Sequence, residues 1–296
     1  MGVQTLSKMI HSECNYGYKH THLSALRGKK IAVDISIYLY RFKRCRQLIP
    51  DMFLLCSLFR ENDISPIFVF DGQPPEHKNE VIEKRREKKK YVRDELEKLD
   101  KILNSSTLTI EERCKYEQER MYVDRMATHI SKEDIENVQS LLSYYGMTWI
   151  NSESEADVTC AWLCNNKYVW GVLSDDTDMF PLGCAFVIRN LNIINESCVV
   201  YDTYKILSEL SMNIHDFRAL CSLSKNDSNT NTNKNLIYDT YKSYKKNNKV
   251  YDSESSIDTS LYNVNCDSPT FQHDFIHNKT FDVMQLKYFL NDFNFY

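Results

Sequence analysis

The chain lacks an excess of positive charge: its 37 lysines and arginines stand against 41 aspartates and glutamates, a formal net charge of −4 at pH 7. Most nucleic-acid binders carry an overall basic charge, so this protein could hold a nucleic acid only through local basic patches. Such binding would depend on few phosphate contacts and would weaken as the salt concentration rises.

Long apolar runs are also absent, since no stretch approaches the roughly 18 apolar residues of a membrane-spanning helix. The N-terminal residues Met-Gly-Val-Gln-Thr-Leu form neither the apolar core of a secretory signal nor the Ser/Thr-bearing pattern of a myristoylation site. We therefore expect an intracellular protein that is not secreted.

The ten cysteines contain no C-x-x-C pair, and several of them sit within apolar segments. Cys160 and Cys164 share one helical face without a nearby histidine or second cysteine pair, so a structural zinc site is not indicated. Buried, reduced thiols are the expected state of these residues.

At 42% hydrophobic residues, the 296-residue chain can build one large α/β domain or two smaller ones. β-rich runs alternate with stretches of helical spacing, which is typical of parallel β-α-β units. We expect strands at residues 29–33, 66–70, 147–150, 169–173 and 186–188, and helical segments at residues 35–60, 131–145 and about 152–163.

Strongly charged, helix-forming sequence fills residues 80–101 and continues over residues 107–131, which predicts a helical insertion that projects from the sheet. The pattern Ser-Lys-Glu-Asp that starts at Ser131 is a capping box for the next helix, and Gly146 is the natural stop of that helix.

From residue 225 to about residue 265 the chain is rich in Asn, Ser, Thr, Asp and Lys. This composition predicts a mobile segment, interrupted by one helix around residues 236–244. An apolar pattern over residues 281–293 predicts a C-terminal helix with a hydrophobic face.

Seven acidic residues sit where predicted strands end or predicted helices begin. Asp34 closes the apolar run of residues 31–33, and Asp71 closes that of residues 67–70. Strand ends of this kind line the ligand crevice of open α/β sheets. Two acid-x-acid pairs follow, and the full set is Asp34, Asp71, Glu155, Asp157, Asp176, Asp178 and Asp227.

A cluster of carboxylates repels itself unless a cation neutralises it. Mg²⁺ takes oxygen ligands, keeps several waters and commonly works on substrate phosphates. Two such ions, about 3.5 to 4 Å apart, can activate a water and stabilise the leaving oxygen of a phosphodiester. Any one acid could instead cap a helix or fill a turn, so it is the joint placement that predicts a metal-dependent nuclease.

Six sequence blocks resemble, in order and spacing, the signature blocks of the flap endonuclease or XPG-type structure-specific 5′ nucleases. They are Met-Gly-Val-Gln (residues 1–4), Val-Asp-Ile-Ser (33–36), Val-Phe-Asp-Gly-Gln-Pro-Pro (69–75), Ser-Glu-Ala-Asp (154–157), Ser-Asp-Asp-Thr-Asp (174–178) and Leu-Cys-Ser-Leu-Ser-Lys-Asn-Asp (220–227). The resemblance covers residue 1 to about residue 227. The short length and the Asn/Lys bias are similar to divergent members encoded by large DNA viruses or by AT-rich genomes.

This resemblance implies a PIN-like fold, a central and mostly parallel sheet flanked by helices, with a helical gateway and cap insertion at about residues 80–135. It implies a nuclease domain over residues 1–227, in which an N-terminal block (1–100) and an internal block (131–227) surround that insertion. Residues 228–296 would form a divergent, degenerate helix-hairpin region.

The resemblance also implies roles for single residues. The seven acids would hold two Mg²⁺ or Mn²⁺ ions, directly or through waters. Lys78 and Arg85 would grip the scissile phosphate from one helix face, although both could belong to an ordinary solvated helix. Tyr40 would stack on the base beside the cut, or alternatively pack in the core. Gly2 would let the backbone approach the substrate, and further DNA contacts would come from Lys84, Lys88 and Lys234.

One part of the sequence departs from the family pattern. The family has a glycine-rich helix-hairpin after its last aspartate, which grips duplex DNA and a monovalent cation. Here residues 228–235 contain neither glycine nor proline, so the preferred DNA structure stays open. Residues 285–289 have some residue types of a sliding-clamp peptide, but the aromatic spacing is wrong and a core helix is the better interpretation.

The sequence thus predicts a monomeric, Mg²⁺-dependent nuclease that cuts DNA at 5′ flap–duplex junctions in replication, repair or recombination. We expect it in the nucleus or, for a viral member, at a cytoplasmic replication site. A 5′ to 3′ exonuclease on DNA or RNA would use the same chemistry on another substrate. A non-catalytic nucleic-acid-binding scaffold is the alternative from another class, and the presence of all seven acids and both basic residues argues against it.

Overall fold

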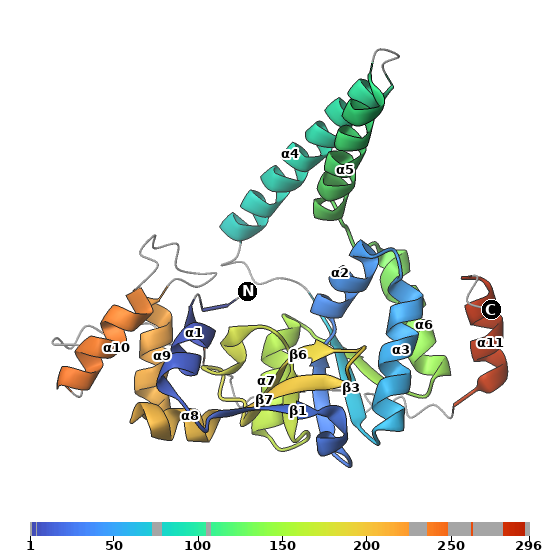
Figure 1. The fold of residues 1–296 in the computed structure, drawn as a ribbon. Coiled ribbons are helices and arrows are strands. Elements are labelled where there is room, and N and C mark those ends of the chain that lie inside the picture. The colour runs from blue at the N-terminus through green and yellow to red at the C-terminus, as the bar shows by residue number, and fades with distance from the viewer. Residues whose placement is uncertain are drawn as a thin grey trace.

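A computed structural model describes residues 2–3, 5–72, 79–104, 108–224, 236–247, 262 and 281–293. They form a seven-stranded sheet between two layers of helices (Figure 1). The strands are β1 (Tyr18–His22), β2 (Lys30–Asp34), β3 (Ser65–Phe70), β4 (Thr148–Asn151), β5 (Gly171–Leu173), β6 (Phe186–Asn192) and β7 (Ser197–Asp202). The helices are α1 (Leu6–Glu13), α2 (Ser36–Arg44), α3 (Leu48–Glu61), α4 (Asn79–Leu103), α5 (Ile110–Met126), α6 (Lys132–Tyr144), α7 (Ala156–Asn165), α8 (Thr203–Leu210), α9 (Ile214–Leu223), α10 (Leu236–Asn247) and α11 (Val283–Asn291), with short 3₁₀ helices η1 (Leu23–Leu26) and η3 (Thr177–Met179).

The sheet has the order β1-β7-β6-β5-β2-β3-β4, and its central strands run parallel. The parallel strands are short apolar runs because helices cover both faces of the sheet. This confirms the predicted fold class. The sequence prediction missed β1 and β7, which add an antiparallel edge. β1 reads Tyr-Lys-His-Thr-His and buries none of its five residues fully, so it carries no apolar signal.

Residues 35–60 are two helices rather than one, which corrects the prediction of a single helical segment. Arg46, between α2 and α3, adopts a left-handed backbone with φ 58°. Pro50 lies in the first turn of α3, where its missing N–H costs nothing, but its ring would clash with the carbonyl of Arg46 in a continuous helix. The chain therefore turns sharply at this point.

Helices α4 and α5 pack against each other and project from the sheet as the charged sequence predicts (Figure 1). Thr109 and Glu112 form a capping box that starts α5, and Arg120 bonds Asp100 across the pair at 2.5 Å. None of the described helices is both long and apolar enough to cross a membrane.

The predicted capping box of α6 is also present. The Ser131 hydroxyl accepts from Asp134 N at 3.1 Å, and the Asp134 carboxylate accepts from Ser131 N at 2.9 Å. Gly146 ends the helix with φ 73°, a backbone conformation that suits glycine. Every cysteine that the structure describes is free, and most are buried, as predicted.

The two C-terminal helices pack on opposite sides of the sheet. α10 buries Ile237 and Tyr241 among the residues of one core, whereas α11 buries Leu286 and Leu290 in the other. The predicted C-terminal helix with a hydrophobic face is therefore present, with Leu286 and Leu290 on that face. The predicted mobile segment beyond residue 247 lies largely outside the described residues.

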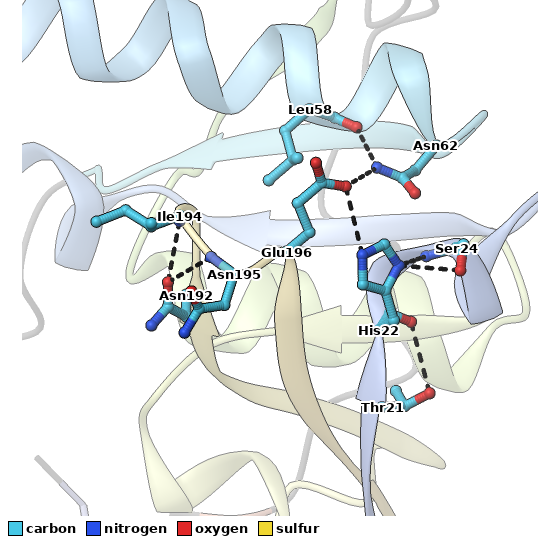
Figure 2. Close-up of polar contacts among 9 residues, drawn as sticks. All are labelled: Thr21, His22, Ser24, Leu58, Asn62, Asn192, Ile194, Asn195 and Glu196. Carbon is cyan, nitrogen blue, oxygen red and sulfur yellow. Dashed lines mark hydrogen bonds and ion pairs between the residues drawn. The ribbon is translucent and has the colours of Figure 1, made fainter.

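The turn between β6 and β7 is tied to two other elements (Figure 2). The Glu196 carboxylate accepts from the Asn62 side chain at 3.1 Å and lies 3.7 Å from His22 Nε2. The backbone carbonyl of Glu196 also accepts from Leu23 N at 2.8 Å. These contacts fix the far end of the hairpin against β1 and the end of α3.

Candidate active site

Acidic residues follow four strands that lie side by side in the sheet, in the order β5-β2-β3-β4. Asp34 ends β2 and Asp71 follows β3 directly. The segment 174–178 follows β5, and Glu155 and Asp157 start the helix after β4. Because these strands are parallel, all of these acids meet at one edge of the sheet.

Asp34 is the most enclosed of these acids, with only 6% of its surface exposed. Its carboxylate accepts from Ser36 N at 3.2 Å and from the Ser174 hydroxyl at 2.9 Å. Burial, together with the negative charges of Asp71 and Asp157, raises the pKa of Asp34 to about 7. The carboxylates therefore lie close enough to repel one another, and a cation would relieve that repulsion.

Asp71 is exposed at the rim of the same cluster. The Ser36 hydroxyl donates to one of its oxygens, and Ala156 N at the start of α7 donates to the other at 2.8 Å. A Cβ on Gly72 would lie 2.1 Å from Ser152 O, so only glycine lets the chain pass this close to the start of α7. Asp71 thus connects the end of β3 to the helix that carries Asp157.

The Asp176 and Asp178 pair is held by the turn that contains it. Ser174 Oγ accepts from Asp176 N at 3.1 Å while it donates to Asp34, so one hydroxyl links the two acidic segments. The Asp176 carboxylate caps η3 by accepting from Asp178 N at 3.0 Å. Asp176 is 8% exposed.

Gly2 lies directly against this turn. A Cβ at Gly2 would lie 2.1 Å from Asp176 Oδ1 and 2.6 Å from Thr177 Oγ1, and the residue has φ +78°. The Thr177 hydroxyl donates to Val3 O at 3.1 Å, which anchors the N-terminus at the site. Gly2 therefore lies beside the acidic cluster, and its approach to a substrate stays a prediction.

Tyr40 is 41% exposed on α2, whereas its neighbours Tyr38 and Leu39 are buried. The structure rules out the core alternative for this ring. Its contact with a nucleic acid stays a prediction.

Several predicted residues fall outside what the structure describes. Asp227, Lys78 and Lys234 lie outside the described residues altogether. Arg85, Lys84 and Lys88 belong to α4, but nothing is described of their side chains. Their roles remain predictions from the resemblance.

Among the described residues, no three acidic, histidine or cysteine side chains form a group tight enough to hold a metal ion. The donor chemistry nevertheless fits a hard divalent cation, since the cluster offers only carboxylate oxygens. Mg²⁺ needs as few as one or two carboxylates when waters complete its shell. The described acids that would hold such an ion, directly or through waters, are Asp34, Asp71, Glu155, Asp157, Asp176 and Asp178.

Two serines of the site were not predicted as functional residues. Ser36 connects Asp34 to Asp71, and Ser174 connects Asp34 to Asp176. The signal for both is a hydroxyl residue placed two positions from an acid, which is common in turns and therefore weak.

The repulsion within the cluster leads to a prediction about stability. We expect Mg²⁺ to raise the unfolding temperature of the wild-type protein, because binding to the folded state at 100 times the dissociation constant stabilises it by about 2.7 kcal/mol. Asp34→Asn should unfold no lower than wild type in EDTA, because a buried repelled charge is lost, and Mg²⁺ should give it a smaller increment. Differential scanning fluorimetry at matched ionic strength measures both, and equal increments in the two proteins would contradict this site.

Comparison with known proteins identifies the family. The model described as the XPG N-terminal domain matches residues 1–92, and the one described as the XPG I-region matches residues 146–227. The chain is 32% identical to flap endonuclease 1 of Enterocytozoon bieneusi, over 75% of this chain and 64% of that protein. It is 30% identical to flap endonuclease 1 of Cryptosporidium parvum, over 76% of this chain and 50% of that protein.

The fold is also similar to that of solved structures. A solved structure of the catalytic core of Rad2 in complex with DNA substrate matches with a TM-score of 0.63, at 20% identity, over 98% of this chain and 95% of that one. The chain spans between half and two thirds of the length of the two flap endonucleases. Because the two XPG models together match more than half of the sequence, the chain belongs to the XPG family.

Proposed function

We propose that this protein is a Mg²⁺-dependent, structure-specific 5′ nuclease that hydrolyses DNA at 5′ flap–duplex junctions. The observation that carries the proposal is the meeting of acids from four adjacent parallel segments at one edge of the sheet. Relatives that are named flap endonuclease 1, and a Rad2 core solved with a DNA substrate, support DNA as the substrate.

Two divalent ions bound at this edge would activate a water and stabilise the leaving oxygen of the phosphodiester. The chain itself supplies the framework for that reaction. The hydroxyls of Ser36 and Ser174 donate to the carboxylates of Asp71 and Asp34 and orient them. Because Gly2 has no side chain, its backbone fits beside Asp176. Lys78 and Arg85 would donate charged hydrogen bonds to the scissile phosphate, which are stronger than neutral ones.

The projecting α4–α5 pair would guide the 5′ single strand. Basic residues Lys84 and Lys88 of α4 suit contact with phosphates, although neighbouring glutamates weaken the field. Lys234 would contact the duplex from the helix-hairpin region. A chain of net negative charge would use these few local contacts, so its affinity for DNA should fall as salt rises, with a slope set by the small number of phosphates contacted.

Tyr40 gives a direct test of the DNA path. We expect Tyr40→Ala to weaken binding of a flap DNA by about 1–3 kcal/mol, because stacking of a base on an aromatic ring has this value. Tyr40→Phe should bind like wild type, since it keeps the ring. Fluorescence anisotropy in EDTA measures binding without cleavage.

The matched control for Tyr40 is Tyr16→Ala, because Tyr16 is a tyrosine that is 81% exposed on another segment. The unfolding temperature of Tyr16→Ala should not change, because its ring is largely exposed, whereas that of Tyr40→Ala should fall slightly, because part of its ring is covered. Equal affinities of Tyr40→Ala and wild type would remove Tyr40 from the DNA path.

A panel of four substrates tests the proposed function: a 5′ flap, a nicked duplex, a blunt duplex and single-stranded RNA. We expect preference for the flap, with one product released at its base. A ladder of short products from duplex ends or RNA would assign a 5′ to 3′ exonuclease instead. Tight binding without cleavage of any substrate would assign a scaffold.

A further inference from the structure

The run Ser-Asp-Asp-Thr-Asp at residues 174–178 contains one acid, Asp175, that is outside the predicted metal set. Both of its carboxylate oxygens are engaged by other elements. Oδ2 accepts from the Arg41 guanidinium of α2 at 2.8 Å, and Oδ1 accepts from Asn190 N of β6 at 2.7 Å. Asp175 therefore faces α2 and β6 rather than the neighbouring carboxylates.

The backbone at Asp175 is held as firmly as its side chain. Its carbonyl accepts from the Arg189 guanidinium at 2.6 Å, and the same guanidinium donates to the Ser7 hydroxyl of α1 at 2.5 Å. Ser174 N donates to Ile188 O at 3.1 Å. Two elements, α2 and β6, thus hold the residue that directly precedes Asp176, and α1 supports this arrangement through Arg189.

The donor at Asn190 depends on an irregular stretch of β6. The pairing register with β7 shifts between Arg189 and Asn192, and Asn190 has a left-handed backbone with φ 54°. Asparagine adopts this conformation at lower cost than most residues, and an irregularity of this kind redirects the backbone groups of the strand that contains it. Here the redirected group is the N–H that meets Asp175.

The ion pair between Arg41 and Asp175 is only partly exposed, with 41% and 23% of the two side chains accessible. The Arg41 guanidinium also lies 5.4 Å from the ring of the buried Tyr38, and it contacts Leu191 O at 3.4 Å. Since Arg41 follows Tyr40 on α2, the pair connects the proposed DNA-facing helix to the turn that carries Asp176 and Asp178.

We propose that Asp175 is a positioning residue: with Arg41 and Asn190 it forms a latch that holds Asp176 and Asp178 where they bind the divalent ion. This inference depends on the proposed metal-dependent function. The latch would act through the backbone of residues 174–178 rather than as a ligand of the ion. Partners of this kind typically account for 10- to 100-fold in metal affinity or activity.

The test measures metal binding without DNA. Mn²⁺ binding, followed by electron paramagnetic resonance of the free ion, gives a dissociation constant for wild type, Asp175→Asn and Arg41→Gln. Each variant should raise this constant about tenfold or more. The double variant should bind little worse than either single one, because both changes break the same contact. Excess Mg²⁺ should restore much of the cleavage rate of each variant.

Glu196→Gln is the matched control. Glu196 lies in the β6–β7 hairpin, which also contains Asn190. Like that of Asp175, its carboxylate accepts a hydrogen bond from another element, but its side-chain partners are Asn62 and His22 (Figure 2). Its Mn²⁺ constant should equal that of wild type. Arg41→Gln is the variant that is expected to fold normally, because the Arg41 side chain is 41% accessible. Weaker Mn²⁺ binding by this variant would therefore not result from unfolding.

Two results would overturn the latch. If wild type binds Mn²⁺ and Asp175→Asn and Arg41→Gln bind it equally well, the latch is wrong while the proposed function stands. If wild type binds no Mn²⁺ at all, the metal-dependent function fails and the latch fails with it.

Discussion

Asp176→Asn should reduce cleavage of a flap DNA by about 1,000-fold or more, since loss of a metal-holding carboxylate removes several kcal/mol of transition-state stabilisation. The fold should survive the change. An asparagine at this position keeps the oxygen that accepts from Asp178 N, and it removes one charge from a repelling cluster. Single-turnover cleavage and the unfolding temperature, measured on the same preparation, separate the two effects.

Asp202→Asn is the matched control for this variant. Asp202 also caps a short helix, accepting from Lys205 N at 3.1 Å, but it lies at the end of the antiparallel strand β7. Its cleavage rate should stay within about twofold of wild type, since asparagine is as good a cap as aspartate. A rate of Asp176→Asn that matches the rate of Asp202→Asn would exclude Asp176 from the reaction.

Gly2→Ala should lower the cleavage rate by about 100-fold, although it adds a single methyl group. That methyl would lie 2.1 Å from Asp176 Oδ1 and 2.9 Å from Asp178 N, so the turn must move by about 1 Å. A misplacement of about 1 Å at a reacting site can cost about 10²-fold in rate. Single-turnover cleavage at saturating Mg²⁺ measures this loss.

The positive φ of Gly2 adds backbone strain to the steric effect, and Gly28→Ala isolates that strain. Gly28 has φ +72°, close to that of Gly2, but a Cβ there would meet nothing within 4 Å. Both variants should therefore lose stability to backbone strain, and Gly2→Ala should lose more because of its steric contacts, whereas only Gly2→Ala should lose cleavage. Equal cleavage by the two variants would mean that Gly2 does not control the geometry of the acids.

The sequence predicts the central sheet well because the parallel strands are buried on both faces. β2 and β3 are short apolar runs that are closed by an acid, and both features can be recognised in the sequence alone. The acids can be predicted for the same reason, since the carboxyl ends of adjacent parallel strands always meet. Their clustering follows from topology rather than from any single contact.

The edge of the sheet and the break between α2 and α3 depend on contacts between distant residues, which the local sequence does not indicate. β1 is an exposed edge strand, so it lacks the apolar alternation that marks a half-buried strand. The break between α2 and α3 depends on a left-handed backbone at Arg46. A glycine would have indicated this conformation in the sequence, but an arginine does not. Only Pro50 gives a local signal for that break.

The contacts that surround the acids could not be predicted from the sequence either. In the run of residues 174–178, Asp175 and Asp176 are chemically identical, and spacing alone cannot separate their roles. Arg41 and Asn190, which engage Asp175, are 134 and 15 residues away along the chain. Only the folded arrangement shows that one acid faces its neighbours and the other faces the scaffold.

The most direct test of the account is cleavage of a 5′-labelled flap DNA with Mg²⁺, compared with the same reaction in EDTA, with product lengths resolved on a gel. We predict one product, cut at the base of the flap, that is formed with Mg²⁺ and absent in EDTA. Cleavage that persists undiminished in EDTA, or an intact flap at every Mg²⁺ concentration, would contradict a metal-dependent flap endonuclease.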